Sequence, residues 1–253
     1  MTFPSWLVTL PVRNEGERLE TSVKRVDSLL KQLGYPYTLL IAEDGSTDNT
    51  FKVAQGLTVT YPNLKLIHND SKLGRGRALR NAWSSTLADV YVFMDADLAT
   101  DIRFLPRLVE RMQIEGLDFV TGSRYSPGSR LRRPLLRKMF SLGYNAIVKA
   151  LFRTEISDHQ CGFKAFSRRA VMTVLPLTRE NGWAWDTEII VYLKNLGWKI
   201  AEIPVSWKEM KSERTPIKRL IYDTREQAFA LVRIFVRSRR IAETPVMTHV
   251  RPA

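Results

Sequence analysis

Residues 90–97 read VYVFMDAD, and this stretch decides how the rest of the sequence is interpreted. Its apolar run predicts a strand that is buried on both faces, as in a sheet covered by helices. Asp95 and Asp97 follow this run directly. Residues i and i+2 at a strand end can turn toward one point, and paired carboxylates without a nearby His or Cys suit Mg²⁺ or Mn²⁺ rather than zinc. The competing interpretation is that both acids only cap the following helix.

The same alternation extends outward on both sides of this stretch. Short apolar runs predict strands at residues 6–12, 37–42, 64–68 and 118–121. Apolar residues spaced by three and four predict helices at residues 17–33, about 48–57, 75–86 and 102–114, the first ending at Gly34. Strands that alternate with helices predict an α/β fold with a largely parallel sheet. Ligands bind beyond the carboxyl ends of such strands, so the polar residues found there are the candidates for chemistry.

The second half of the sequence is less regular. Residues 127–138, PGSRLRRPLLRK, are basic and contain two prolines, which predicts a mobile loop leading into a helix over about 134–152. Further strands are predicted at 162–166 and 199–205, and a further helix at 185–196. Residues 217–240 predict a long amphipathic helix or helix pair, and the last dozen residues predict an unstructured tail.

The composition excludes several classes of protein. The chain has 253 residues, 44% of them hydrophobic, and one Cys, which excludes a disordered or fibrous chain, a disulfide framework and a zinc site built from cysteines. The start lacks a basic segment followed by an apolar core, and the late apolar run AFALVRIFV is interrupted by Arg233 and too short to span a bilayer. We therefore expect a cytoplasmic protein. The net charge of +13 predicts an anionic partner, which could be nucleic acid, a lipid surface or a phosphorylated substrate.

Three further polar clusters follow predicted strands. PVRNE begins at Pro11, EDGSTD begins at Glu43, and GSR ends at Arg124. The second cluster has two interpretations, because its sequence is ordinary for turns and helix caps, whereas an acid at a strand end can also hydrogen-bond a ribose. Residues 72–77, KLGRGR, are basic and rich in glycine but lack the phosphate-loop pattern, so they are weak evidence by themselves.

Six motifs occur in a fixed order between about residues 6 and 215: PVRNE, EDGSTDNT, DADLAT, GSRY, QCGFKAF and WAWDTE. In order and spacing they resemble the inverting glycosyltransferases of family 2 with the GT-A fold, and most closely the dolichyl- or polyprenyl-phosphate hexosyltransferases. The resemblance implies a GT-A catalytic domain over residues 1–215, with a mostly parallel central sheet flanked by helices. An amphipathic, membrane-facing segment would follow over 216–240, and a flexible tail over 241–253.

The resemblance also implies roles for individual residues, each at the position that matches a motif. Asp95 and Asp97 are the expected ligands of Mn²⁺ or Mg²⁺, with Asp97 the firmer of the two. The nucleotide is expected to contact Pro11, Arg13, Glu15, Asp44, Lys72 and Ala96. The acceptor phosphate is expected at Arg124, Arg137 and Ser141, and the sugar at Gln160, Trp185, Asp186, Glu188 and Arg214. The residues expected to carry the reaction are Asp95, Asp97, Arg124 and Arg137.

These residues are consistent with one mechanism. When a nucleotide sugar breaks at its anomeric carbon, charge is left on the diphosphate, and a divalent ion and cationic side chains stabilise that charge. The acceptor phosphate is already anionic, so no strong general base is needed, and the three His lie outside the six motifs. Arg124 and Arg137 would hold the phosphate in line, unless Arg137 only belongs to a solvated basic face. Attack from the opposite face predicts a β-linked product from an α-linked donor.

The basic segments predict a membrane surface as a partner. Residues 130–138 contain five basic residues, and residues 217–240 are amphipathic. Each Lys or Arg near an anionic bilayer gains about 1 kcal/mol, and an amphipathic helix can bury its apolar face in the interface without spanning it. We therefore expect a peripheral protein at the cytoplasmic membrane face, and a membrane-anchored partner stays open. The alternative is that the C-terminal helix packs on the catalytic core or on a second copy.

The donor is the least determined feature of the sequence. DADL resembles mannosyl members, whereas the following Ala-Thr and the segment HQCGFK resemble glucosyl members, so GDP-mannose is narrowly preferred to UDP-glucose. Ala99 stands where mannosyl members often have Gln, and residues 211–214 read KSER where the family usually has GSK.

Three alternatives to a lipid-phosphate hexosyltransferase are weighed. A family 2 enzyme with another acceptor stays open, although the QxxRW motif of processive members is absent. A sugar nucleotidyltransferase is disfavoured because no GxGTRL-like segment follows the first strand. A nucleic-acid-binding protein would explain the charge, but no helix-turn-helix, zinc or RNP motif occurs, so we expect no nucleic-acid partner.

Overall fold

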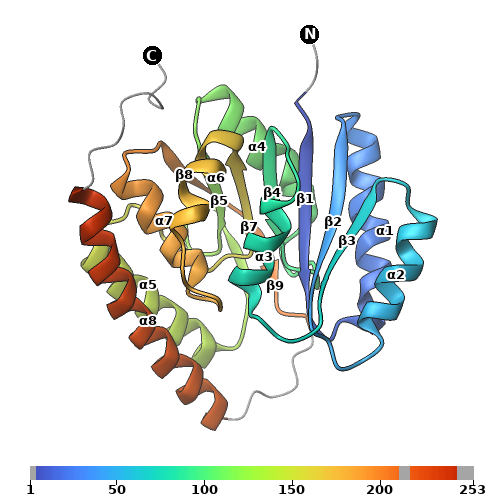
Figure 1. Cartoon of the computed structure of the whole chain (residues 1–253). Helices are drawn as coiled ribbons and strands as arrows, with labels where there is room; N and C mark the ends of the chain where they lie inside the picture. Colours follow the sequence, from blue (N-terminus) through green and yellow to red (C-terminus); the bar gives the residue numbers. More distant parts are fainter. Residues whose placement is uncertain (1–3, 211–216, 244–253) are drawn as a thin grey trace.

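The apolar runs form the strands of a seven-stranded sheet in the computed structural model, which describes residues 4–210 and 217–243. The strand order is β3-β2-β1-β4-β7-β5-β8 (Figure 1). The strands are β1 (Trp6–Val12), β2 (Tyr37–Asp44), β3 (Leu64–Asn69), β4 (Val90–Met94), β5 (Phe119–Ser123), β7 (Phe163–Ser167) and β8 (Ile200–Pro204). A separate two-stranded sheet consists of β6 (Arg130–Arg132) and β9 (Ser206–Lys208).

Neighbouring strands of the large sheet are parallel except at β7, which runs antiparallel to both β4 and β5. The prediction of an α/β fold with a largely parallel sheet is therefore confirmed. Because β1 lies between β2 and β4, the carboxyl ends of these three strands meet at one edge of the sheet. The polar segments that follow them emerge together at this edge.

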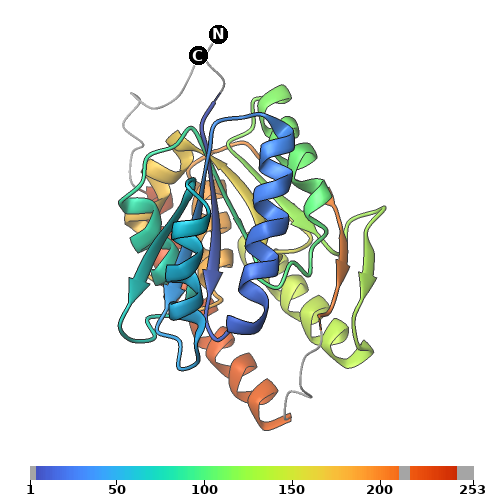
Figure 2. The same ribbon diagram turned by 90° about the vertical axis from the view of Figure 1, so that its right-hand side faces the viewer.

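Helices cover both faces of the sheet and divide the core into two layers (Figures 1 and 2). One face is covered by α1 (Gly16–Leu33), α2 (Thr50–Thr60) and α4 (Leu105–Ile114), with η1 (Ile102–Phe104) before α4. The other face is covered by α3 (Arg75–Ser84), α6 (Arg168–Val174), η2 (Leu175–Leu177) and α7 (Trp185–Asn195). The outer side of this second layer is formed by α5 (Leu135–Phe152) and α8 (Ile217–Glu243), which contact each other.

The structure contains elements that the sequence pattern does not predict. Strand β6 lies inside the predicted loop over 127–138, and it pairs with β9, with Arg130 opposite Ser206. Strands of three residues are too short to show a period of two, and their pairing depends on distant residues. Helix α6 is also unpredicted, although Ser167 caps it by accepting a hydrogen bond from the Ala170 amide at 3.2 Å. The predicted end of α1 at Gly34 is confirmed, since Gly34 has a φ of 72°.

Helix α8 is one continuous helix rather than a pair, and it includes residues 241–243, which were expected in the tail. Its buried residues Ala230, Leu231 and Ile234 belong to the second core layer, so one face of this helix packs on the rest of the domain. Two further predictions lie outside the described residues. They concern Arg214 and the remainder of the expected tail, residues 244–253. Within the described ranges, none of the helices has the length and apolar character needed to cross a bilayer.

Candidate active site

A cavity of about 1330 Å³ lies at the carboxyl edge of the sheet and extends between α5 and α8. Most of the predicted site residues line it, although they are far apart in the sequence. They are Pro11, Arg13, Glu15, Asp44, Asp95, Ala96, Asp97, Arg124, Arg137, Ser141 and Gln160. The parallel strands explain this convergence, because their carboxyl ends deliver separate motifs to the same edge.

Four carboxylates form what we call the carboxylate end of the cavity: Glu15, Asp44, Asp95 and Asp97. Burial raises the pKa of Asp95 to about 6, against the opposing charge of Arg75 and with the added repulsion of Asp97. Burial also raises the pKa of Glu15, and Asp97 and Asp95 add to that rise while Arg18 opposes it. Glu15, Asp95 and Asp97 are therefore close enough to repel one another, and a bound cation would relieve this repulsion.

The carboxylate pair has the donor set of a hard divalent ion. Among the described residues, no three His, Cys, Asp or Glu side chains are grouped so that they could hold a metal by themselves. A protein usually binds Mg²⁺ through one or two carboxylates, and the ion takes its other ligands from substrate phosphates and water. Asp95 and Asp97 fit that mode of binding, in which the diphosphate completes the site.

Asp44 is fixed by the backbone of a neighbouring loop. Its carboxylate accepts hydrogen bonds from the Leu73 amide at 2.7 Å and from the Gly74 amide at 2.9 Å. These bonds connect the end of β2 to the residues just before α3. Lys72 itself is exposed and is not among the residues that line the cavity, so its expected contact with the nucleotide has no support from its position.

Arg75 is a cavity residue that the sequence reasoning did not select. Its guanidinium lies between the rings of Phe93 and Trp183, at 4.9 and 4.6 Å from their centroids. It forms ion pairs with Asp95 at 3.2 Å and with Asp186 at 3.1 Å. The basic segment KLGRGR contained this residue, but only the fold brings the start of α3 against the end of β4.

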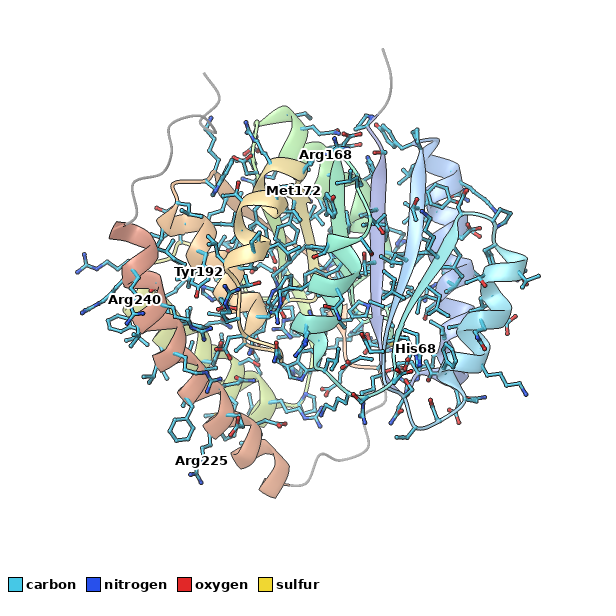
Figure 3. All side chains as sticks on the ribbon, viewed as in Figure 1. His68, Arg168, Met172, Tyr192, Arg225 and Arg240 are labelled. Atoms are coloured by element: carbon cyan, nitrogen blue, oxygen red, sulfur yellow. The ribbon has the colours of Figure 1, made fainter. Side chains whose placement is uncertain are left out.

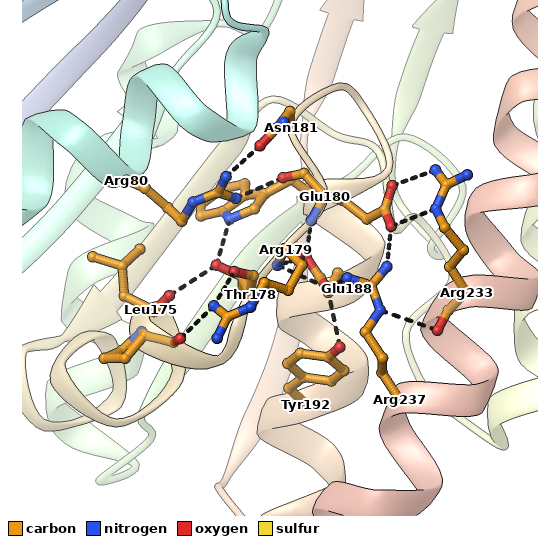
Figure 4. Close-up of polar contacts among 12 residues, drawn as sticks. Arg80, Leu175, Thr178, Arg179, Glu180, Asn181, Glu188, Tyr192, Arg233 and Arg237 are labelled. Atoms are coloured by element: carbon orange, nitrogen blue, oxygen red, sulfur yellow. Dashed lines mark hydrogen bonds and ion pairs between the residues drawn. The ribbon is translucent and has the colours of Figure 1, made fainter.

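Three residues expected on the sugar side are buried behind the cavity instead of lining it. Trp185 is fully buried in the second core layer, and Trp183, two residues earlier, lines the cavity in its place. Asp186 is buried and pairs with Lys164 at 3.0 Å as well as with Arg75. Glu188 is buried too, and it accepts hydrogen bonds from the backbone before α7 (Figure 4). These acids support the site rather than face it, because the first turn of α7 points into the core.

Two of the expected phosphate-binding arginines already have carboxylate partners. Arg124 donates to Asp158 through Nε at 2.6 Å and through Nη2 at 2.8 Å. Burial alone would raise the pKa of Asp158, but the charge and hydrogen bonds of Arg124 hold it below its usual value. Arg137 forms an ion pair with Glu209. Both arginines line the cavity, and both have their charge partly neutralised.

Arg133 completes an arginine cluster with Arg124 and Arg137, and the sequence reasoning did not single it out. Its Nη1 donates to Ser141 at 2.8 Å, and its guanidinium lies 5.5 Å from the centre of the Trp207 ring. Its Nε is buried and makes no hydrogen bond. Burial lowers the pKa of Arg133, and the charge of Arg124 acts in the same direction. An anion in the cavity would satisfy this donor.

The far part of the cavity, which we call the helical end, is largely apolar. Its apolar lining side chains come from α5 and α8: Leu136, Met139, Phe140, Ile147, Leu151, Ala228, Leu231 and Val232. The polar residues Asp223, Thr224 and Gln227 of α8 also line it. Met139 is 61% exposed and Val232 is 62% exposed, so this surface is uncovered. Figure 3 shows Arg225 and Arg240 extending outward from α8. The cavity therefore joins a charged end to an apolar end.

A comparison with protein families decides the class of this chain. The family model described as "Glycosyl transferase family 2" matches residues 7–175, which include the carboxylate end and Arg124. The chain belongs to glycosyltransferase family 2. It is therefore an enzyme of the transferase class, as the motifs predict, and the resemblance to this family is confirmed.

Several relatives of this family 2 glycosyltransferase carry names. Glycosyltransferase AglD of Haloferax volcanii is 38% identical over 79% of this chain. The chain spans about a third of that relative's length, since the match covers 32% of it. The dolichyl-phosphate beta-glucosyltransferase ALG5A of Trichomonas vaginalis is 29% identical, with 85% of this chain and 69% of the relative covered. The dolichyl-phosphate beta-glucosyltransferase of Saccharomyces cerevisiae is 27% identical, with 82% and 68% covered.

A solved structure resembles the fold of this family 2 glycosyltransferase. Glucosyl-3-phosphoglycerate synthase from Mycobacterium tuberculosis, in complex with Mn²⁺, UDP and glucosyl-3-phosphoglycerate, aligns with a TM-score of 0.71 and 19% identity. The alignment covers 92% of this chain and 80% of that one. The expected GT-A fold is therefore confirmed.

Proposed function

We propose that this chain transfers a hexose from a nucleotide sugar to a dolichyl or polyprenyl phosphate, with inversion at the anomeric carbon. The observation that carries the proposal is the single cavity in which the carboxylate end, the arginine cluster and the helical end follow one another. A lipid phosphate has the matching order of parts, because an anionic phosphate is joined to a long apolar chain. The names of the curated relatives support the same acceptor.

The arginine cluster supplies the contacts for the acceptor phosphate in this proposal. Arg133 offers the buried Nε that makes no hydrogen bond, and Ser141 orients its other end. Arg124, clamped by Asp158, adds a fixed positive charge beside it. An oxygen of the phosphate forms the new bond to the anomeric carbon as the bond from that carbon to the diphosphate breaks. The acceptor oxygen is already anionic, so the step needs no general base.

Asp95 and Asp97 would hold Mn²⁺ or Mg²⁺ at the carboxylate end. The ion, when bound, would neutralise the charge that develops on the departing diphosphate. Arg75 keeps Asp95 beside the cavity through their ion pair, and Asp186 with Lys164 fixes Arg75 from behind. Asp44 is held by the loop before α3, at the end of β2 where the nucleotide is expected.

The donor in this proposal is UDP-glucose. The relatives whose names state a sugar are glucosyltransferases, and this favours glucose over the mannose that the DADL motif suggests. GDP-mannose is the second candidate, and a donor comparison separates the two. The same comparison includes the bare diphosphate products as inhibitors, because a site for UDP should bind UDP more tightly than GDP.

The uncovered apolar surface supports a position at a membrane. Phe229, Val232 and Val236 lie on α8 at helical spacing and are at least half exposed, while Arg225 and Arg240 extend from the same helix (Figure 3). An interfacial helix has this composition, with apolar side chains inserted among the lipids and arginines at the headgroups. We place the chain at the cytoplasmic face, as a peripheral protein, and a membrane-anchored partner stays a prediction.

The test is a transfer assay with purified chain, Mn²⁺ and a panel of donors and acceptors. We expect transfer from UDP-glucose to dolichyl phosphate in mixed micelles, and none to 3-phosphoglycerate, which has a phosphate but no apolar chain. Transfer to 3-phosphoglycerate alone would contradict the lipid acceptor. Transfer from GDP-mannose alone would contradict the donor while leaving the acceptor intact. The anomeric configuration of the product, read by NMR, tests inversion.

A further inference from the structure

The loop over 178–184 connects the membrane-facing helix to the carboxylate end of the cavity. It lies between η2 and α7 and contacts α8 on one side and the start of α3 on the other (Figure 4). Only its last two residues, Trp183 and Ala184, belong to one of the six motifs, and the proposed reaction assigns no role to either.

The α8 side of the loop is held by two arginines and two acids. Arg233 donates to the Glu180 carboxylate through Nε at 3.0 Å and through Nη2 at 2.7 Å. Arg237 reaches the same carboxylate and also lies 3.3 Å from Glu188. Glu188 in turn accepts hydrogen bonds from the Glu180 amide at 2.8 Å and from the Arg179 amide. Both the side chain and the backbone of the loop are therefore tied to α8.

The α3 side of the loop is held through its backbone. The Asn181 carbonyl accepts a hydrogen bond from the Gly76 amide at 2.7 Å, in the first turn of α3. Arg80 donates to the Glu180 carbonyl at 2.7 Å and to the Asn181 side chain. A displacement of the loop would therefore act directly on the turn that carries Arg75.

The loop ends at the cavity itself. Trp183 lies on the guanidinium of Arg75, and that guanidinium pairs with Asp95. Trp183 is 59% exposed, so its position depends on the loop rather than on packing in the core. Contacts therefore run without a break from α8 through the loop to one of the two aspartates expected to bind the metal.

We propose that Arg233 and Arg237 are positioning residues, which hold the loop over 178–184 so that Trp183 and Arg75 stay against Asp95. The position of α8 on the core then affects the catalytic site, because two arginines of this helix hold the loop in place. Helix α8 does not need these ion pairs to stay on the core, since Ala230, Leu231 and Ile234 are buried there. The Arg233 side chain is half exposed and that of Arg237 is partly exposed, and ion pairs of this kind contribute little net stability. Their effect here is to hold the loop in one arrangement.

The first test measures kcat for hexose transfer, and it rests on the proposed function. We expect the double variant Arg233→Ala with Arg237→Ala to lower kcat for hexose transfer about tenfold at a temperature at which it is fully folded. Its melting temperature should fall, because Glu180 and Glu188 are buried and lose their partners, so kcat is measured well below it. Arg239→Ala is the matched control. It removes a cation from the same helix, but the Arg239 side chain lies on the Phe235 ring and not against the loop, so kcat should be unchanged. The double variant Arg233→Lys with Arg237→Lys should recover part of the rate.

A double-mutant cycle distinguishes positioning from general destabilisation. In a Trp183→Ala background, removal of the two arginines should lower kcat by less than about twofold, because the residue through which they act is already missing. Independent, multiplicative losses would overturn the inference. So would a fall in activity that follows the melting temperature across all variants.

Tryptophan fluorescence gives a second readout, which does not depend on any acceptor. Of the six tryptophans, all within the described residues, Trp183 is the exposed one, so the difference between the chain and its Trp183→Phe variant reports this residue. Acrylamide should quench that difference signal more strongly after removal of the two arginines than after Arg239→Ala. Unchanged quenching overturns the inference. A chain that fails to transfer hexose to any lipid phosphate contradicts the proposed function instead, and the quenching result still decides the inference.

Discussion

The carboxylate end and the helical end of the cavity are built in different ways. Asp44 ends β2 and Asp95 follows β4, the two strands on either side of β1, and hydrogen bonds with backbone groups fix the positions of both residues. The helical end is made of apolar side chains on two helices, and many of these side chains are uncovered. A soluble surface seldom leaves such a patch open unless it binds something. The fold itself therefore fixes the carboxylate end, whereas the helical end keeps an apolar surface that a binding partner could cover.

The largest expected effect is at the carboxylate end. Asp97→Ala should lower hexose transfer by about a thousandfold or more, because a group that stabilises charge in the transition state is removed. The fold should survive, since the Asp97 side chain accepts a hydrogen bond from the nearby Ala99 amide at 3.0 Å and lies at the edge of the sheet. The measurement is the initial rate at saturating Mn²⁺ with the melting temperature alongside. Glu110→Gln, an exposed acid on α4, is the control, and retained activity in Asp97→Ala would refute the assigned role.

A smaller loss should follow from a change that leaves both aspartates in place. A Cβ added at Gly162 would lie 2.0 Å from the Asp95 carboxylate, so Gly162→Ala must displace that side chain. We expect transfer to fall by about ten- to a hundredfold, since misplacing a reacting group by about 1 Å costs that much. Gly56→Ala is the control, because a Cβ there meets nothing within 4 Å, and it should stabilise α2 slightly. Equal activity of both variants would show that the position of Asp95 is unimportant.

This contrast also explains what the sequence could and could not predict. The strand VYVFM and the acids after it lie within eight residues, so a local pattern sufficed to find them. The fold class followed from the same patterns, because strands and helices alternate. Arg75 and Arg133 were missed because each is one cation in a basic run, and only tertiary contacts with Phe93, Trp183 or Trp207 distinguish it.

The burial of Trp185, Asp186 and Glu188 in α7, which the sequence did not predict, has a related cause. Only Trp183 of the motif WAWDTE lines the cavity, whereas the other five residues are buried. The sequence does not show where the helix begins. Trp183 precedes α7 and faces the cavity, whereas Trp185 is its first residue and is buried. A shift of two residues at a helix start turns a side chain to the other side, so the motif alone could not assign the roles. The same limit applies to Glu188, which serves the backbone of the preceding loop.

The arginine cluster, which separates the two ends, gives the next effect. Arg133→Ala should raise KM for the lipid phosphate about tenfold, because a charged hydrogen-bond donor contributes about 1.5–3 kcal/mol. Arg137→Ala should have a smaller effect, since Glu209 already neutralises part of its charge. The measurement is acceptor KM for each variant, with UDP affinity as the control that should not change. Equal effects of the two variants, or a loss of UDP affinity, would contradict this division of the cavity.

The smallest expected effect is on stability, and it concerns His159, which follows Asp158, the partner of Arg124. His159 is buried, and its Nδ1 lies 2.8 Å from the Asn145 Oδ1, an acceptor, so that nitrogen carries the proton and Nε2 accepts from Thr154 at 2.7 Å. Burial lowers the pKa of His159 from 6.5 to about 3, and Lys164 and Lys149 act in the same direction against Asp158. The folded chain therefore keeps this imidazole neutral.

The sign of the pH dependence follows from that neutrality. Below pH 6.5 His159 binds a proton in the unfolded chain but stays neutral in the folded chain. The contribution of His159 to the free energy of unfolding is therefore fully present above this pH, and it is lost as the pH decreases toward about 3. We expect a contribution of roughly 1 kcal/mol per pH unit between about pH 6 and 4, measured by urea unfolding. His159→Gln keeps hydrogen-bonding groups but does not titrate, so its curve should be flatter over this interval. Parallel curves for the two chains would show that the buried imidazole does not control stability over this interval.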